Sequence, residues 1–442
     1  MLTFHTSVGV REHTGGQPYS PYASRMDDLG DAAVALLSDL VAIDSVNPGL
    51  VDDAAGESAI VAFLANRLRA NGFTVTIINA EGHANRPSLL AVGPGPADAP
   101  TVVLNGHLDT VGVSGMPSPF TPRVEGHQLF GRGAADMKGG VAALIVAAER
   151  LATDRLNADR LTPYQPTHEG PTLEQPTGAR GGIRPVLALV TDEEDASLGS
   201  EAVIAALAAL NIQPDVCLIG EPTDLAPCRT LRGFGVARVS FQGRAAHSSQ
   251  PHLGVNALTH LGRFLHAVDE RAPHLHTEGS DLMVTVARGG SSAFVIPDSA
   301  ERLVEIRTSP GGRGASVLNE IDALLDPAWG ATVTLVAARD GWRLDDTGPA
   351  ADLATRLGAA LTTNAAFDAP YWMEAPLWQA VCPTLICRPS GGGLHAAEDG
   401  STCVRSALSP TRSSTSSPRG APRPADPRGL RCDAARPSGG RR

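Results

Sequence analysis

The stretch PVLALVTDEEDASLGSEAVIAALAALNIQPDVCLIG, residues 185–220, decides the fold. It opens with an apolar run, PVLALVT, and closes with a second one, DVCLIG, each of the length of a buried strand. Between them, SEAVIAALAAL is predicted to be a helix. A strand, a helix and a strand in this order predict the α/β class, with a mostly parallel sheet and helices on both faces.

The flanking sequence extends this pattern and then changes. Upstream, strands are predicted over 73–80, 87–93 and 99–107, and helices over 27–45, 57–72 and 139–152. Downstream, strands are predicted over 233–244, 281–288, 301–307 and 331–338, and helices over 254–270 and 314–326. The downstream order is β-α-β-β-α-β, which indicates a separate, smaller α+β unit. After about 345 the pattern returns to that of the first domain.

These patterns predict one domain inserted into another. The catalytic domain is expected in two parts, 27–229 and 343–399, with the smaller domain, 230–342, between them. Residues 153–184 are polar and Pro-rich and are predicted to be a disordered insertion. A loose leader, 1–26, and a disordered tail, 400–442, complete the chain.

The composition limits the classes of function. The 442 residues carry a formal net charge of −11, which argues against a nucleic-acid partner. No apolar run approaches the roughly 18–20 residues of a membrane helix, and the N-terminus lacks the apolar core of a signal peptide. The six cysteines form no C-x-x-C pair and are expected to be free thiols. We therefore expect a cytoplasmic protein with no membrane contact.

Candidate ligands lie where the predicted strands and turns end. They are His107 and Asp109, Asp136, Glu193 and Glu194, Glu221, and His395. In parallel α/β sheets, ligands bind at the carboxyl ends of strands. Each candidate also has a structural alternative: an N-cap for Asp136, a solvated acidic turn for Glu193 and Glu194, a structural role for a lone histidine.

Together the candidates suit a metal centre. Imidazole with carboxylate favours zinc, with cobalt or manganese as alternatives in the same geometry. Two metals about 3.5–4 Å apart need a bridging ligand, and Asp136 can supply it. One glutamate of the Glu193–Glu194 pair can bind metal while the other deprotonates the bridging water. Asp109 can hold the ring of His107 and fix its tautomer.

Five motifs in order, HLDTV, GRGAADMKGG, TDEED, IGEPT and AAHSSQPHLGVNA, resemble those of the zinc aminoacylase–carboxypeptidase family. Its members include acetylornithine deacetylase, succinyl-diaminopimelate desuccinylase, aminoacylase and glutamate carboxypeptidase, and CLIGEPTDL and GRAAHSSQPHLGVNAL resemble the deacetylase branch most. The resemblance covers roughly residues 27–399, apart from 153–184. It implies a dinuclear-metal catalytic domain, an inserted dimerisation or lid domain, and a homodimer formed through that domain.

The resemblance also implies roles for the candidates. In the catalytic domain it implies that His107 and Glu221 bind one metal, that Glu194 and His395 bind the second, and that Asp136 bridges the two. It also implies that Asp109 orients His107 and that Glu193 is the general base. In the inserted domain it implies that His247 reaches the partner's active site and stabilises the oxyanion. Arg307 and Asn256 would bind the substrate. Phe294 is a departure, because the family often has Asn there.

The predicted activity is hydrolysis of the amide bond of a small N-acylated amino acid, such as acetylornithine, with two divalent metal ions as cofactors. A dipeptidase or carboxypeptidase with the same metal site is the alternative within the class. A pseudoenzyme that binds a ligand, or a catalytically impaired product of a frame-shifted gene, is the alternative from a different class.

The sequence changes character after the acidic pair Glu398–Asp399. Residues 400–442 hold nine arginines, two aspartates and many Ser and Pro residues. A one-base shift near codon 399 would turn Gly-Ser-Thr-Cys into a sequence such as Trp-Val-Asp-Leu, which resembles the start of the family's final helix. We therefore predict that 400–442 is read from a shifted frame; a genuine disordered basic tail is the alternative.

Overall fold

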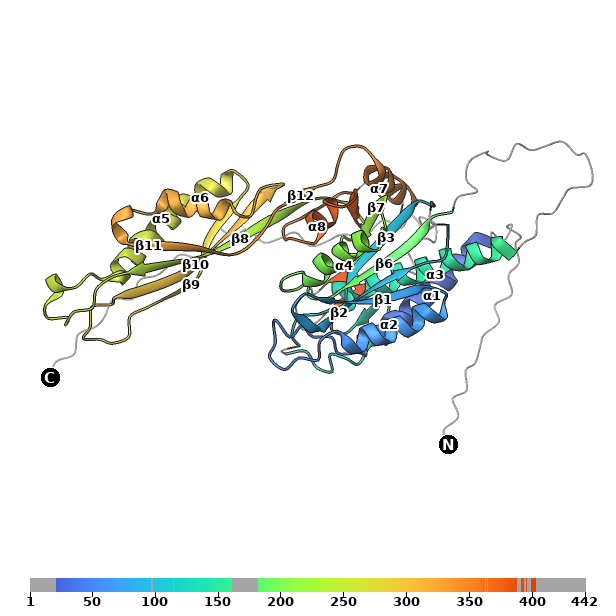
Figure 1. Cartoon of the computed structure of the whole chain (residues 1–442), viewed down its shortest axis with the longest axis horizontal. Coiled ribbons are helices and arrows are strands. Elements are labelled where there is room, and N and C mark those ends of the chain that lie inside the picture. The colour runs from blue at the N-terminus through green and yellow to red at the C-terminus, as the bar shows by residue number, and fades with distance from the viewer. Residues whose placement is uncertain are drawn as a thin grey trace, which may run out of the picture. The chain divides into compact units, whose positions relative to one another are not determined.

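The computed structural model (Figure 1) describes residues 21–402 except 97, 114, 161–181, 362, 364, 388–390, 393–394 and 396–398. Helix α1 (Pro21–Val41) includes residues 21–26, which the sequence analysis assigned to the leader. Helix α3 (Gly139–Arg160) likewise runs into the predicted insertion. The rest of the predicted leader, residues 1–20, the segment 161–181 of the insertion, and 403–442 of the tail lie outside the described residues.

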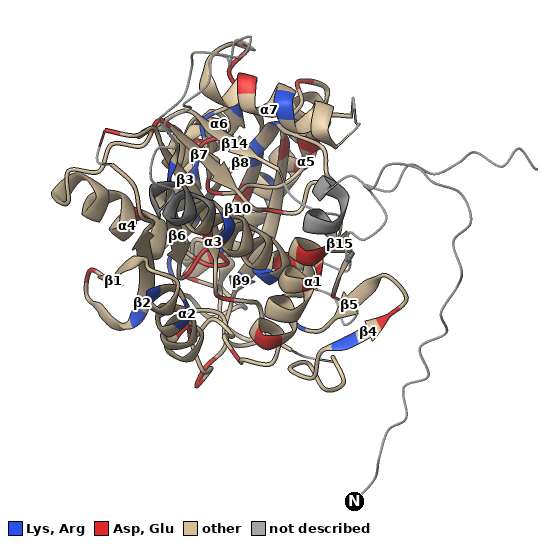
Figure 2. Ribbon diagram, turned by 90° about the vertical axis from the view of Figure 1, so that its right-hand side faces the viewer, with Lys and Arg blue, Asp and Glu red and all other residues tan. Residues whose placement is uncertain are grey.

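The first domain is built on a six-stranded sheet in the order β1-β2-β6-β3-β7-β14. The strands are β1 (Thr74–Ala80), β2 (His83–Val92), β3 (Thr101–His107), β6 (Arg184–Val190), β7 (Val216–Ile219) and β14 (Thr384–Ile386). Only β2 runs antiparallel to its neighbours; the other pairings are parallel. Strands β3, β7 and β14 contain no charged residue (Figure 2), as expected of strands buried on both faces.

Helices cover both faces of this sheet, as predicted. Besides α1 and α3 they are α2 (Ser58–Ala70), α4 (Leu198–Ala209), α7 (Pro349–Ala360) and α8 (Ala375–Gln379). Helices α1, α2 and α3 share one core, and α4, α7 and α8 share the other. Along β6, Leu187 and Leu189 belong to the first core, whereas Val186, Ala188 and Val190 belong to the second. The uniformly apolar run therefore supplies both cores, because successive side chains of a strand point to opposite faces.

A small sheet joins the glycine-rich turn to the end of the described chain. Its order is β15 (Gly391–Gly392), β16 (Gly400–Thr402), β5 (Gln128–Phe130) and β4 (Arg123–Glu125). After β5 comes the turn that ends in η1 (Ala134–Lys138), a short segment before α3 in which Asp136 and Met137 have non-helical backbone angles. Pairing of β16 with β5 places Asp399 beside this turn, and it shows that residues 400–402 of the predicted tail form a strand.

The second domain has the predicted β-α-β-β-α-β order. Its elements are β8 (Cys228–Gln242), η2 (Pro251–Leu253), α5 (Ala257–Thr277), β9 (Asp281–Gly289), β10 (Ser299–Pro310), α6 (Ser316–Leu324), η3 (Pro327–Trp329) and β11 (Ala331–Arg339). The sheet order is β11-β8-β10-β9, with every pairing antiparallel. Residues of α5 and α6 share one core with the sheet. The mixed α/β fold with a separate second domain is therefore confirmed.

Strand β8 belongs to both domains. Cys228 and Leu231 at its start pack in a core of the first domain, whereas Val239 and Phe241 near its end pack in the core of the second. Two short strands, β12 (Trp342–Arg343) and β13 (Phe367–Ala369), pair with the first part of β8. The predicted boundary at 229–230 therefore lies within a strand.

No helix among the described residues is both long and apolar enough to cross a membrane. The cysteines that the structure describes are free and buried: Cys217, Cys228, Cys382 and Cys387.

Candidate metal centre

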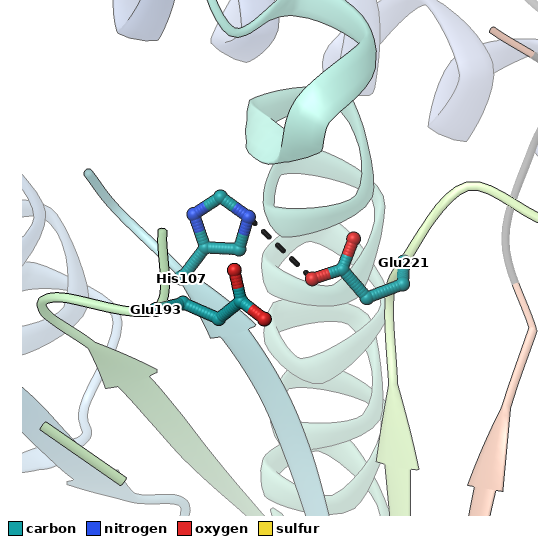
Figure 3. Close-up of side chains that lie close together, drawn as sticks. All are labelled: His107, Glu193 and Glu221. Carbon is teal, nitrogen blue, oxygen red and sulfur yellow. Dashed lines mark ion pairs between the residues drawn. The ribbon is translucent and has the colours of Figure 1, made fainter. Parts of the chain in front are cut away.

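His107 is the last residue of β3, and its side chain is 1% exposed. Its Nδ1 lies 3.0 Å from the main-chain oxygen of Asp109, so a neutral ring donates its Nδ1 proton there. Nε2 then carries the lone pair, and it faces Oδ1 of Asp136 at 3.3 Å and Oε1 of Glu221 at 3.4 Å (Figure 3 shows the latter pair). The ring is therefore oriented as that of a metal ligand would be.

Asp136 lies between the two candidate histidines. Its Oδ1 faces His107, and its Oδ2 is 3.4 Å from Nε2 of His395. The same nitrogen of His395 is 3.0 Å from Oε2 of Glu194. Asp136 is not the N-cap considered above, because α3 begins at Gly139 and the carboxylate faces the histidines. A carboxylate with one oxygen toward each histidine has the arrangement of a bridge between two cations.

The distances between the ligand atoms fit two divalent cations. Two ligands bound to zinc at about 2.0–2.1 Å with a tetrahedral angle lie about 3.3–3.4 Å apart. The nitrogen–oxygen distances in the two groups are 3.0–3.4 Å. One group comprises His107, Asp136 and Glu221, and the other comprises His395, Asp136 and Glu194. Imidazole and carboxylate ligands suit zinc, cobalt or manganese.

Glu193 and Glu194 follow β6 and face different parts of the cluster. The ligand atoms of Glu193, His107 and Glu221 lie within 4.8 Å of one another (Figure 3). The ligand atoms of Glu194, His107 and Asp136 form a second such group. The glutamates do not form a solvated turn, because the side chain of Glu194 is only 6% exposed. Glu193 therefore lies beside His107 and Glu221, and Glu194 lies beside Asp136 and His395.

The cluster holds more carboxylates than cationic groups, and the pKa values reflect this. Burial raises the pKa of Glu193 well above its usual range, and the charge of Glu221 raises it further. Burial also raises the pKa of Glu194. Hydrogen bonds to Asp136 and Glu194 raise the pKa of His395 to about 10. Retained protons thus offset the repulsion between carboxylates, and bound divalent cations would replace those protons.

Asp109 is fully buried and contacts more than its predicted partner. Its carboxylate Oδ1 is 3.5 Å from Nδ1 of His107, which is farther than its own main-chain oxygen. Oδ1 also accepts a hydrogen bond from the backbone N–H of Glu193, and Oδ2 accepts one from that of Glu194, each at 3.1 Å. Asp109 therefore fixes the turn that carries both glutamates as well as the histidine ring.

Sequence reasoning missed the buried polar residues that support this centre. They are Asn47, Glu57, Arg86 and Asp192, each at most 7% exposed. Their partners are distant in the sequence, so no local motif marks them. The one available signal is charge within apolar surroundings, as for Glu57 in GESAIVAF and Arg86 in NRPSLLAV.

The sequence analysis named Asp399 only as part of an acidic pair, yet it supports the turn that carries Asp136. Its carboxylate accepts hydrogen bonds from the backbone N–H groups of Gly133 and Ala135 at 2.8 and 2.7 Å. It also accepts one from Nη1 of Arg132 at 3.2 Å. Asp399 therefore holds in place the backbone of the turn that carries Asp136.

The candidates in the second domain contact other partners. His247 is exposed, with Nδ1 2.8 Å from Oγ of Ser249. Arg307 donates to Glu305 at 2.6 Å, and the side chain of Asn256 caps α5. Among the contacts of the described residues, none joins these side chains to the His107–His395 cluster, so their roles stay predictions. Phe294, at the position of the expected Asn, is 71% exposed.

Comparisons with known proteins show which families parts of this chain resemble. Residues 103–163 match the sequence model of peptidase family M20/M25/M40, and residues 229–332 match that of the peptidase dimerisation domain. Similar solved structures include a tripeptidase from Staphylococcus aureus (TM-score 0.63, 15% identity, 85% of this chain and 94% of that chain covered). Human carnosine dipeptidase 1 is another (TM-score 0.59, 17% identity, 86% of this chain and 95% of that chain covered). A third is the YxeP protein of Bacillus subtilis, described as a dinuclear metal binding peptidase from the M20 family (TM-score 0.56, 14% identity, 84% of this chain and 93% of that chain covered).

At these identities the structures show the fold alone, and the family resemblance rests on the two sequence models. The first model covers β3, the glycine-rich turn and α3, which hold His107 and Asp136, and the second covers most of the inserted domain. The findings support no particular branch of the family, including the deacetylase branch. Residues 103–163 and 229–332 thus resemble M20 peptidases, and the matches indicate a hydrolase that acts on amide or peptide bonds.

Proposed function

We propose that the protein hydrolyses the amide bond of a small N-acylated amino acid, using two divalent metal ions. The observation that carries the proposal is the position of Asp136, with one carboxylate oxygen toward each histidine. His107 and Glu221 would hold one ion, and His395 and Glu194 the other. When bound, the ions would polarise the scissile carbonyl and lower the pKa of water toward neutrality.

Glu193 is the proposed general base. Its backbone N–H is held by Asp109, and its carboxylate lies beside His107 and Glu221. Burial raises its pKa, which favours uptake of a proton from water and its transfer to the leaving amine. Since the same groups would serve any small amide, the pocket rather than the metal centre selects the substrate.

A second candidate substrate is a short peptide. Two of the similar structures are named as a tripeptidase and as a carnosine dipeptidase. An assay of kcat/KM across N-acetyl amino acids, N-succinyl amino acids and dipeptides separates the two candidates. Preference for the acylated amino acids supports the first proposal, and preference for dipeptides supports the second.

The metal centre is tested with Glu193→Gln and Glu221→Gln. Glu193→Gln should keep two metal ions per chain and lose about 10²–10⁴-fold in kcat. Glu221→Gln should lose one ion, measured by elemental analysis after dialysis. Glu125→Gln changes an exposed carboxylate in β4 and should alter neither quantity. Activity that survives in Glu193→Gln would remove it from the role of base.

We also propose a homodimer in which His247 of one chain acts in the active site of the other. The match of residues 229–332 to a dimerisation domain supports this. His247→Ala and Glu193→Gln should each be inactive alone. Random mixing of the two should restore about a quarter of wild-type activity, because half of the dimers then hold one intact site of two. No recovery would show that His247 does not act across chains.

A further inference from the structure

A set of hydrogen-bonded polar side chains connects the interior of the first domain to the candidate metal centre. Its members are Asn47, Glu57, Arg86, Asp109 and Asp192. Their exposed fractions are 0–7%, so they exchange hydrogen bonds with one another rather than with water. They come from different segments: the loop after α1, the residue before α2, strand β2, and the loops after β3 and β6.

Asn47 is the centre of this set. Its Oδ1 accepts hydrogen bonds from the backbone N–H of Gly49 at 2.7 Å and from Nη2 of Arg86 at 3.0 Å. Its Nδ2 donates to Oδ2 of Asp109 at 2.8 Å and to Oδ1 of Asp192 at 3.1 Å. A flipped amide would turn its oxygen toward two carboxylates and its NH2 group toward two donors. The orientation of Asn47 is therefore fixed.

Arg86 holds both Asn47 and Asp192. It binds Glu57 through Nε at 3.1 Å and Nη2 at 2.8 Å, and Nη2 is also 2.7 Å from Oδ1 of Asp192. Asp192 directly precedes Glu193 and has a φ of +68°, in the left-handed region that few non-glycine residues adopt and that Asp tolerates better than most. The bonds from Arg86 and Asn47 hold the carboxylate of Asp192 in place.

Asp109 connects Asn47 to the candidate metal centre through hydrogen bonds. The amide of Asn47 and the backbone N–H of Glu194 both donate to its Oδ2, at 2.8 and 3.1 Å. Its Oδ1 accepts from the N–H of Glu193 and lies 3.5 Å from Nδ1 of His107. A displacement of Asp109 therefore moves one histidine and both glutamates together.

We propose that Asn47, held by Arg86, is a positioning residue for the metal centre. It fixes Asp109 from one side and Asp192 from the other, and so aligns the groups that receive the ions and the proton. Replacing buried ion pairs by apolar residues of the same volume is often neutral or stabilising, so stability alone does not account for a buried polar set that reaches the metal centre. The inference rests on the proposed function of the centre.

The test compares Asn47→Ala and Arg86→Lys with the wild type, each loaded with Co²⁺. Asn47→Ala removes the amide from Asp109, and Arg86→Lys keeps the charge but loses the planar fork. At saturating Co²⁺ we expect kcat to fall about 10–100-fold in both variants, with KM changed by less than about twofold. Calorimetry should show about tenfold weaker Co²⁺ binding. The visible absorption of bound Co²⁺, which reports ligand geometry, should also change.

Arg67→Lys is the matched control. Arg67 of α2 makes a bidentate pair with Glu149 of α3, at 2.8 Å for both bonds, among residues outside the centre. Its substitution makes the same chemical change and should leave kcat and the Co²⁺ spectrum at wild-type values. A merely structural role of Asn47 and Arg86 would lower the melting temperature of their variants without altering either readout.

The proposal is overturned if the folded Asn47→Ala and Arg86→Lys variants keep wild-type Co²⁺ affinity, spectrum and kcat. If Asn47→Ala does not fold, Arg86→Lys decides alone, because it retains the positive charge beside Glu57. Failure of the proposed function is a different result: the wild type itself would then bind no Co²⁺ or hydrolyse none of the substrates.

Discussion

The carboxylate of Asp399 is expected to stabilise the turn that carries Asp136, and Asp399→Asn tests this. The side chain is 1% exposed, and each of its oxygens accepts a backbone N–H, from Ala135 and Gly133, with Arg132 as a third donor. Asn keeps the shape but replaces one acceptor oxygen by an NH2 group. That group would face a backbone N–H, so at least one buried donor would lose its acceptor.

The expected loss of unfolding free energy is about 2 kcal/mol. A buried donor without a partner costs about 1–3 kcal/mol, and breaking a buried ion pair costs about 3–5 kcal/mol. Burial raises the pKa of Asp399, which means that the ionised carboxylate already bears a desolvation cost that Asn lacks. The net effect therefore lies toward the lower end of these ranges. A change of this size alters an equilibrium constant roughly 30-fold.

Two measurements check the expected loss of unfolding free energy and its effect on the metal centre. Guanidinium unfolding of the metal-free chain gives the free energy, and calorimetry with Co²⁺ gives the affinity of the centre, which should fall by up to about 30-fold as the turn loosens. Asp352→Asn is the control, since Asp352 is exposed in the first turn of α7 and should change stability by less than about 0.5 kcal/mol. Unchanged stability and affinity in Asp399→Asn would refute the reasoning.

Two further predictions concern buried charge. Burial raises the pKa of Glu374 to about 7, so the folded metal-free chain takes up a proton that the unfolded chain does not, and stability falls as pH rises from about 4.5 to 7. In chemical denaturation, the unfolding free energy of Glu374→Gln should therefore equal that of the wild type below pH 4.5 and exceed it above pH 7 by up to about 3 kcal/mol. A difference in unfolding free energy that stays constant with pH would contradict this. Arg302 is 1% exposed, and none of its guanidinium nitrogens has a hydrogen-bond partner among the described residues. Its Cζ lies 4.4 Å from the ring centroid of Phe241 and 4.0 Å from that of Phe264. Arg302→Met should raise the stability of the second domain by about 1–3 kcal/mol; a loss would show that the cation–π contacts outweigh desolvation.

Much of the fold and the candidate ligands could be predicted from the sequence because both follow from short-range patterns. The run at 185–190 is apolar throughout, as is typical of a strand buried on both faces. Parallel strands end at one edge of the sheet, so His107 at the end of β3, Glu193 after β6 and Glu221 after β7 converge there. Where the ligands lie thus follows once the direction of the strands is known.

The supporting residues could not be predicted, since their bonds span long distances in the sequence. Asn47 and Asp192, for example, are 145 residues apart, and neither belongs to a periodic pattern. Element ends were also missed where tertiary contacts decide them. Strand β8 begins at Cys228 because its first residues pair with β12 and β13, a contact that no local signal announces.

The last described strand constrains the predicted frame shift. A Cβ added to Gly400 would lie 2.7 Å from Cδ1 of Phe130, so the Trp or Arg of the alternative frame requires Phe130 or β16 to move. The frame correction changes residue 400 but keeps an acidic residue at position 399. If the missing base lies at the third position of codon 399, that codon still begins with GA and encodes Asp or Glu. A corrected coding sequence is therefore expected to change how the chain packs on β5 after residue 399, while it retains the carboxylate that holds the turn of Asp136.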